Sequence, residues 1–204
     1  GFERTVAPSL HVVTLTEYDA TFGLSVAFPK QAFSGNLSEV LSAHGRTNLR
    51  LAETEKYAHV TYFFNCGDEK PSSGEDRILI PSPSVPTYDL EPAMSAATIT
   101  DHLVDDLAAR RHDFVICNFA NADMVGHTGK IAAARKAVEV VDSCIGSLAE
   151  AVNEQNGVMV ITADHGNVEQ MLDSDLSEFH TAHTVNPVPM VEPICKYARL
   201  VDDA

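Results

Sequence analysis

Residues 114–161 read FVICNFANADMVGHTGKIAAARKAVEVVDSCIGSLAEAVNEQNGVMVI, and a continuous apolar run stands at each end of this stretch. The runs at 114–117 and 158–161 are typical of parallel strands that are buried on both faces. Between them, apolar residues recur at steps of three and four from Ile131 to Val152, which predicts one long amphipathic helix. Strand, helix and strand in this order predict a parallel sheet that is covered by helices.

The same alternation continues on both sides of this stretch. A helix with Ile99, Leu103 and Leu107 on one face is expected before it. The whole pattern predicts an α/β fold of three layers, with a mostly parallel sheet between two layers of helices. The other expected elements are helices at 36–45, capped by Asn36, and at 95–110, strands at 10–15, 48–52, 59–64 and 188–191, and a loop through Pro86 that encloses the apolar run 77–80.

The composition limits the classes of partner. The chain has 204 residues, with 14 Lys+Arg against 29 Asp+Glu and a formal net charge of -15. This length allows one domain, or one domain and a fragment of a second. An electrostatic field of this sign repels nucleic acids and anionic membrane surfaces. An anionic substrate would therefore need local cations, which metal ions could supply.

The cysteines and the apolar runs indicate the compartment. Cys66, Cys117, Cys144 and Cys195 are far apart and show no CxxC pairing, so we expect reduced core residues in a reducing compartment. No apolar run approaches the roughly 20 residues that are needed to cross a bilayer. The first residues also lack the profile of a signal peptide. These observations predict a cytoplasmic protein without membrane contact.

Polar side chains gather just beyond two of the expected strands. Asp123 and His127 follow the first strand, Asp164 and His165 follow the second, and His183 lies in a polar loop before the last one. The carboxyl ends of parallel strands share one edge of a sheet, and ligands bind at that edge. Each residue alone is more typical of a solvated or hydrogen-bonded loop residue than of a ligand. Together they predict a site.

Two carboxylates and three imidazoles at one edge predict metal binding, because the sequence places no Lys or Arg beside the two acids. A divalent ion would offset the cost of bringing these acids together, and mixed imidazole and carboxylate ligands favour Mn, Fe, Co or Zn over Ca or Mg. Asp123, His127 and His183 make a site with three ligands. Asp164 and His165 supply only part of a second site.

Four ordered motifs resemble those of the cofactor-independent phosphoglycerate mutases, which belong to the alkaline phosphatase superfamily. The resemblance implies an alkaline phosphatase-like phosphatase domain with an inserted transferase domain. It assigns residues 1–28 to the tail of the transferase domain and residues 29–204 to the C-terminal part of the phosphatase domain, whose sheet would be incomplete here. The motifs are AETEKY at 52–57, NFANADMVGHTG at 118–129, TADHGN at 162–167 and HTAHTVNPVP at 180–189.

The resemblance also implies roles for the metal ligands. Asp123, His127 and His183 would hold one manganese ion, and Asp164 and His165 would hold a second. The phosphorylated serine of the family, and an aspartate that completes the second site, come from a segment that matches nothing in this chain. The isolated chain is therefore expected to lack mutase activity.

Three other residues need an interpretation. The resemblance implies that Lys56 contacts the phosphoryl group during transfer, where a fixed ammonium stabilises charge on the phosphoryl oxygens. Considered alone, Lys56 is equally typical of a surface lysine. His180 is left without a role and is expected to be a loop residue. Ser34 precedes the helix cap and is expected to belong to the capping segment rather than to act as a nucleophile.

The implied activity is the interconversion of 3-phosphoglycerate and 2-phosphoglycerate in glycolysis, through a phosphoserine, by a monomer that acts on a small-molecule substrate. One alternative is another metalloenzyme of the superfamily, such as a phosphopentomutase or a simple phosphatase. The motifs at 52–57 and 186–189 argue against it. A second alternative is a metal-binding fragment without catalysis.

Overall fold

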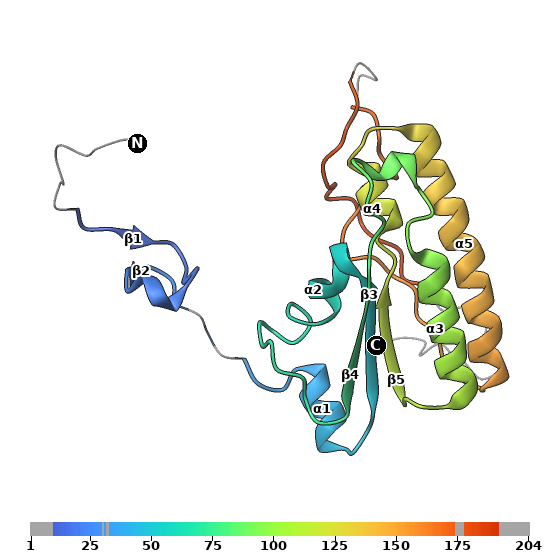
Figure 1. Ribbon diagram of the computed structural model, residues 1–204, viewed down its shortest axis with the longest axis horizontal. Coiled ribbons are helices and arrows are strands. Elements are labelled where there is room, and N and C mark those ends of the chain that lie inside the picture. The colour runs from blue at the N-terminus through green and yellow to red at the C-terminus, as the bar shows by residue number, and fades with distance from the viewer. Residues whose placement is uncertain (1–9, 30, 32, 174–177, 192–204) are drawn as a thin grey trace, which may run out of the picture. The chain divides into compact units, whose positions relative to one another are not determined.

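The computed structural model describes residues 10–29, 31, 33–173 and 178–191. The chain divides into two units, Gly1–Ser34 and Gly35–Ala204. Figure 1 shows the helices and strands of both units as a coloured ribbon. Within the described residues, no helix combines the length and the apolarity that crossing a membrane requires.

The first unit contains one small pair of strands. β1 (Val13–Thr14) pairs in parallel with β2 (Ser25–Val26), and the 3-10 helix η1 (Ala20–Phe22) lies between them in the chain. The side chain of Asp19 caps this helix by accepting a hydrogen bond from the backbone N–H of Thr21. The strand expected at 10–15 is therefore confirmed only over two residues.

The second unit is built on a three-stranded parallel sheet of order β4-β3-β5. Its strands are β3 (Asn48–Glu53), β4 (Glu75–Ile80) and β5 (Phe114–Asn118). All six residues of β3 are buried, because this strand is paired on both edges and covered on both faces. The predicted strands at 48–52 and 114–117 are confirmed. The expected burial of the second is not, because β5 lies at an edge of the described sheet, with Phe114 exposed and the other residues half-buried.

Helices cover both faces of this sheet. In Figure 1, α1 (Leu37–Ala43) and α2 (Tyr57–Val60) lie on one side, and α3 (Ala96–Ala109) and α5 (Ile131–Glu154) lie on the other. The three-layer α/β arrangement is therefore confirmed. The main core forms between the sheet and the long helices, and its buried members are Leu49, Leu51, Ile80, Ile99, Leu103 and Leu148.

The ends of the helices follow the sequence signals. Asn36 caps α1 by accepting a hydrogen bond from the backbone N–H of Glu39 at 3.0 Å. Gly45 follows the end of α1 with a φ of 64°, a left-handed conformation that glycine adopts without strain. α3 and α5 lie where their apolar periodicity predicts them. The remaining short helices are η2 (Thr54–Lys56), η3 (Tyr88–Leu90) and α4 (Asn121–Gly126).

The strand predicted at 59–64 is wrong. This segment contains the end of α2 and a series of turns in which the Thr61 hydroxyl donates to the Tyr57 carbonyl at 2.7 Å and the Phe63 N–H donates to the Ala58 carbonyl at 2.9 Å. Its aromatic and β-branched residues resemble a strand, but both edges of β3 are already occupied by β4 and β5. The segment therefore satisfies its backbone locally.

The loop predicted around 77–80 is also wrong, because β4 occupies Glu75–Ile80. β4 lies at an edge of the described sheet, and its first half is charged, with Glu75, Asp76 and Arg77. Edge strands tolerate charge because one side of the strand does not pair with a neighbour. The strand is therefore longer than the apolar run at 77–80 indicates.

The strands predicted at 158–161 and 188–191 are not formed. Ile161 and Val191 make one isolated antiparallel bridge, with two N–H to carbonyl hydrogen bonds of 2.8 Å. Met159 packs against the main core, whereas Val158 and Val160 are 64% and 59% exposed. Only one face of the run is covered, so its apolar pattern does not lead to a buried parallel strand.

The cysteines that the structure describes are free, as predicted, but they are not all core residues. Cys144 is buried and Cys117 is half-buried, whereas Cys66 is exposed. Cys66 lies in the turn after α2, where it adopts a φ of 56°. This turn replaces the strand expected at 59–64, so Cys66 does not enter the core. Cys195 lies outside the described residues.

Candidate metal centre

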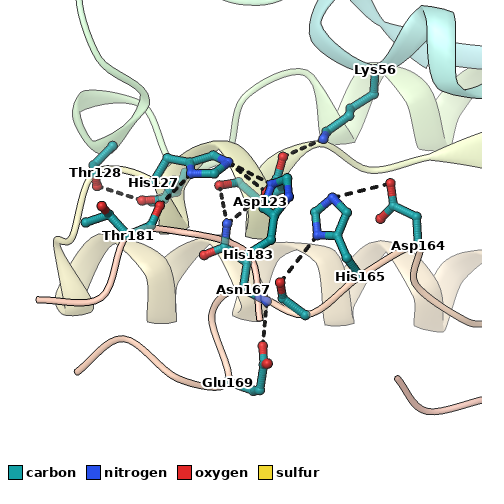
Figure 2. Close-up of polar contacts among 12 residues, drawn as sticks. Lys56, Asp123, His127, Thr128, Asp164, His165, Asn167, Glu169, Thr181 and His183 are labelled. Carbon is teal, nitrogen blue, oxygen red and sulfur yellow. Dashed lines mark hydrogen bonds and ion pairs between the residues drawn. The ribbon is translucent and has the colours of Figure 1, made fainter. Parts of the chain in front are cut away.

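Three side chains converge above the carboxyl end of the sheet. His127 Nε2 and His183 Nε2 lie 3.0 and 3.1 Å from Asp123 Oδ1, and 3.1 Å from each other. Figure 2 shows the two imidazoles directed at this carboxylate. The structure therefore brings together Asp123, His127 and His183, the three residues that the sequence groups into one site.

Local structure explains the position of the first two residues. α4 begins directly after β5, and it was not predicted from the sequence. Asp123 lies on this helix and His127 follows its last residue, so they are four residues apart on one helical face. α4 therefore points both side chains from the end of β5 toward His183.

The hydrogen bonds of His127 fix its tautomer. His127 Nδ1 lies 2.7 Å from the carbonyl of Thr181, which can only accept, so Nδ1 carries a proton. The Nε2 atom of a neutral ring then presents its lone pair to Asp123 and His183. A backbone carbonyl in this position is the usual partner that orients a metal-binding histidine.

The spacing of the three atoms suits a divalent transition metal. Ligand atoms about 2.1 Å from an ion and at right angles to one another are about 3.0 Å apart. The distances of 3.0, 3.1 and 3.1 Å observed between the Asp123, His127 and His183 atoms match this value. Because two imidazole nitrogens and one carboxylate oxygen face each other, a cation fits at their shared centre.

Lys56 forms an ion pair with Asp123 that the local sequence does not indicate. Its ammonium group donates a hydrogen bond to Oδ2 of Asp123, and both side chains are largely buried. The expectation that no lysine or arginine lies near the acids is therefore wrong for Asp123. The two residues are 67 positions apart, and η2 after the central strand β3 brings them together.

The same contacts set the acidity of Asp123. Burial raises the pKa of this carboxyl group, but the hydrogen bonds from Lys56 and Asn167 and the charge of Lys56 outweigh burial and lower the pKa to about 2. Asp123 is thus a carboxylate at neutral pH, as a metal ligand must be.

Asn167 and Gly126 also shape the site, and neither was predicted from the sequence. Asn167 Nδ2 donates to Asp123 Oδ1 at 2.8 Å and to the Asp123 carbonyl at 3.3 Å. A Cβ on Gly126 would lie 2.3 Å from Asn167 Oδ1, so only glycine leaves room for this amide. Asn167 stands inside the motif TADHGN, two residues after His165, and this adjacency was the available signal.

Asp164 and His165 lie beside this group without joining it. The His165 ring stacks on the His183 ring with centroids 3.6 Å apart, and His165 Nε2 lies 3.5 Å from Asp164 Oδ2. In the part of the chain that the structure describes, only Asp123, His127 and His183 form a cluster of three possible ligands. His180 lies near Asp173, at 3.5 Å, and is not a member of the cluster.

The comparison with a protein family agrees with this chemistry. The family model described as "Metalloenzyme superfamily" matches residues 24–193, which include every residue of the cluster. This chain belongs to the metalloenzyme superfamily. A divalent metal is therefore the group that the centre suits, and the family match and the geometry of Asp123, His127 and His183 agree on it.

Individual relatives of this metalloenzyme superfamily chain are phosphoglycerate mutases. It is 54% identical over 191 residues to the 2,3-bisphosphoglycerate-independent phosphoglycerate mutase of Shewanella baltica (strain OS185), covering 94% of this chain and 37% of that protein. It is 56% identical over 188 residues to the 2,3-bisphosphoglycerate-independent phosphoglycerate mutase 1 of Methanosarcina acetivorans, covering 92% of this chain and 36% of that one. The chain thus spans about a third of the length of these relatives.

A solved structure gives the same result for the fold. The crystal structure of Leishmania mexicana phosphoglycerate mutase at low cobalt concentration superposes with a TM-score of 0.79 and 32% sequence identity, covering 89% of this chain and 36% of that chain. The resemblance to cofactor-independent phosphoglycerate mutases and the α/β fold are therefore confirmed.

Proposed function

We propose that this chain provides the metal-binding part of a cofactor-independent phosphoglycerate mutase, which interconverts 3-phosphoglycerate and 2-phosphoglycerate through a phosphoserine. The observation that carries the proposal is the convergence of Asp123, His127 and His183 in a chain that is 54% identical to enzymes of this name. The serine belongs to a part of the protein outside these 204 residues.

The ligand set is part of this proposal. The convergence of Asp123, His127 and His183 supports their assignment to one ion, and the resemblance to the family assigns Asp164 and His165 to a second. When bound, the ions supply charge that lowers the pKa of the serine hydroxyl and stabilises the phosphoryl oxygens. The Thr181 carbonyl keeps His127 in the tautomer that exposes Nε2. Asn167 holds the Asp123 carboxylate in its orientation.

Lys56 would bind the phosphoryl group during transfer. Its side chain is buried, and it is held at the centre by Asp123 Oδ2. An ammonium fixed in a poorly solvated site stabilises developing negative charge more strongly than one in water, because little water has to reorganise. Lys56 would thus pair with the metal ligand Asp123 and also stabilise negative charge on the equatorial phosphoryl oxygens.

We further infer the metal, the pathway and the location of the enzyme. The ions are Mn²⁺, and the enzyme acts in glycolysis as a cytoplasmic monomer. Residues 1–28 are the tail of the inserted transferase domain, and residues 29–204 are the C-terminal part of the phosphatase domain. The identity to phosphoglycerate mutases over most of the chain favours mutase activity over that of a phosphopentomutase or a simple phosphatase.

Metal analysis of the purified chain tests the proposal. After dialysis against Mn²⁺ we expect about one tightly held ion per chain, because the first site has three ligands here and the second has two. Asp123→Asn, which keeps the shape of the side chain but removes its charge, should abolish tight binding. Absence of tight binding in the unchanged chain would refute the proposal, and two tight ions would show that a ligand is misassigned.

Activity assays test the substrate. The isolated chain should not convert 3-phosphoglycerate, whereas the gene product that contains the serine should convert 3-phosphoglycerate and not a phosphopentose. Conversion by the isolated chain that is lost in Asp164→Ala would contradict the placement of the serine outside the chain.

A further inference from the structure

Glu169 connects the two loops that carry the histidines of the metal centre, and the proposed function gives it no role. Its Oε2 accepts a hydrogen bond from the backbone N–H of Asn167 at 2.6 Å. Its Oε1 accepts one from the Thr184 hydroxyl and one from Asn186 Nδ2 at 3.1 Å. One carboxylate thus receives three donors, one from its own loop and two from the loop of His183.

The backbone at the crossing of these loops leaves no spare room. The Thr184 N–H donates to the Gly166 carbonyl at 2.9 Å, directly beside His183 and His165 in the chain. A Cβ on Gly166 would lie 2.2 Å from both Glu169 Oε1 and Thr184 Oγ1. The hydrogen bond between Glu169 and Thr184 therefore lies directly against Gly166, and the two loops are closely packed at this point.

This contact sets the relative position of the two imidazoles. His183 and His165 precede Thr184 and Gly166, and their rings stack at 3.6 Å with an interplanar angle of 20°. Beside the two histidines, loss of the connection at Glu169 would leave the backbone bridge of Gly166 and Thr184 and the 3.5 Å contact between Asn186 Nδ2 and Gln170 Oε1. His183 could then move away from Asp123 by the few tenths of an ångström that a metal site does not tolerate.

The connection also reaches the carboxylate of the centre. Asn167, whose N–H is held by Glu169, donates through its side chain to Asp123 Oδ1 at 2.8 Å. Figure 2 shows Glu169 below Asn167, on the side away from the imidazoles. Glu169 thus acts on Asp123 through Asn167 and on His183 through Thr184, without touching the centre itself.

We infer that Glu169 is a positioning residue, which holds Asp123 and His183 at the spacing that a divalent metal requires. The inference rests on the proposed metal function. Loss of an outer contact of a metal ligand costs about 10- to 100-fold in metal affinity. Because Glu169 is exposed to solvent, its removal leaves no buried charge unpaired, so the effect falls on the geometry more than on folding.

Cobalt titration of the 204-residue chain tests this inference, with Co²⁺ as the probe and its visible absorption as the readout of ligand geometry. Glu169→Gln keeps one acceptor oxygen for two loops, and Glu169→Ala keeps none. We expect the Co²⁺ dissociation constant to rise about 10-fold in the first variant and up to about 100-fold in the second, with an altered spectrum at saturation. The matched control is Glu154→Gln at the exposed end of α5, which should leave affinity and spectrum unchanged.

A second pair of variants separates positioning from general loosening of the fold. Thr184→Val removes the hydroxyl that donates to Glu169. If the two residues act as one connection, Thr184→Val should weaken Co²⁺ binding little or not at all once Glu169 is already Gln. Urea unfolding of the metal-free variants should remain close to that of the unchanged chain.

The outcomes distinguish this inference from the proposed function. Tight Co²⁺ binding by the unchanged chain with the same affinity and spectrum in Glu169→Ala would overturn the positioning role alone. Fully additive losses in Glu169→Gln and Thr184→Val would also overturn it. Absence of Co²⁺ binding in the unchanged chain would overturn the proposed function together with this inference.

Discussion

The ammonium group of Lys56 is in direct contact with Oδ2 of Asp123, and the exposed fractions of the two side chains are only 6% and 13%. Oδ1 of the same carboxylate faces His127 and His183 at 3.0 and 3.1 Å. Oδ2 of Asp123 is thus paired with the ammonium group of Lys56, which follows β3, while Oδ1 is available to a cation. This division allows a largely buried acid to remain charged.

Lys56→Met should destabilise the metal-free chain, because it leaves the Asp123 carboxylate buried without its charged partner. Loss of one member of a buried ion pair costs about 3 kcal/mol. Saturating Mn²⁺ should recover part of this loss, since the ion replaces the missing positive charge. Urea unfolding with and without Mn²⁺ measures both effects.

The control for this experiment is Lys136→Met on α5. Lys136 lies 3.6 Å from Glu139 in a pair that is more than half exposed, so its loss should cost less than about 1 kcal/mol and should not respond to Mn²⁺. Equal destabilisation of the two variants would show that the contact with Asp123 contributes nothing specific.

His183→Ala and His180→Ala should differ in metal content, although the two histidines lie three positions apart. His183 Nε2 lies at the centre, whereas His180 lies near Asp173. His183→Ala should weaken Mn²⁺ binding by more than the roughly 10- to 100-fold that loss of an outer contact costs, and His180→Ala by less. Equilibrium dialysis measures the bound metal, and equal losses would contradict the assignment of His183 as a ligand.

The parts of the fold that the sequence predicted are those in which a pattern covers a whole element. The apolar residues of α5 follow one face over 24 residues, and β5 is a single apolar run. Asp123 and His127 could be placed at the sheet edge because both follow β5, and ligands bind at the carboxyl ends of parallel strands. His183 joins them although the strand expected after it is not formed.

The parts that could not be predicted depend on contacts between distant segments. The segment at 59–64 has strand-like residues but continues from α2 into turns with local hydrogen bonds, and the run at 158–161 is covered on one face only. The pairing of Lys56 with Asp123 joins residues 67 positions apart, and no local pattern encodes it. Asp123 is therefore paired, contrary to what the local sequence around it indicates, because Lys56 reaches it from a distant segment.

Gly126→Ala should disturb the metal centre by steric overlap. The added Cβ would lie 2.3 Å from Asn167 Oδ1 and 2.9 Å from Val168 Cγ1, so Asn167 must leave its hydrogen bond to Asp123. Overpacking of this kind costs about 1–3 kcal/mol. We expect a lower midpoint of urea unfolding and weaker Mn²⁺ binding in the same variant.

Gly146→Ala on α5 is the matched control. Outside its own stretch of helix, no heavy atom lies within 4 Å of the methyl group that this change adds, and alanine favours a helix over glycine by about 1 kcal/mol. Gly146→Ala should therefore stabilise the chain and leave Mn²⁺ binding unchanged. Destabilisation in both variants would show that the site around Gly126 is not especially crowded.

Glu75 should make the stability of the chain depend on acid. Burial raises the pKa of this carboxyl group, but hydrogen bonds from Asn65, Arg77, Ser38 and the Ser72 N–H outweigh burial and hold the pKa below its ordinary value of 4.5. A carboxyl group with a lower pKa in the folded state stabilises the fold above the unfolded pKa. This contribution is lost as the pH falls below 4.5 and through the folded pKa.

Glu75→Gln removes the titrating group, so the unfolding free energy of the variant should fall less steeply below about pH 5 than that of the unchanged chain. At about pH 7 the variant should be less stable by about 1.5–3 kcal/mol, the contribution of hydrogen bonds to a charged group. This difference should shrink as the pH approaches that at which Glu75 is protonated in the folded chain, with a slope of at most about 1.4 kcal/mol per pH unit. Urea unfolding between about pH 7 and pH 3 measures it, with the exposed Glu150→Gln as control, and a difference that is constant over this range would contradict the role of Glu75.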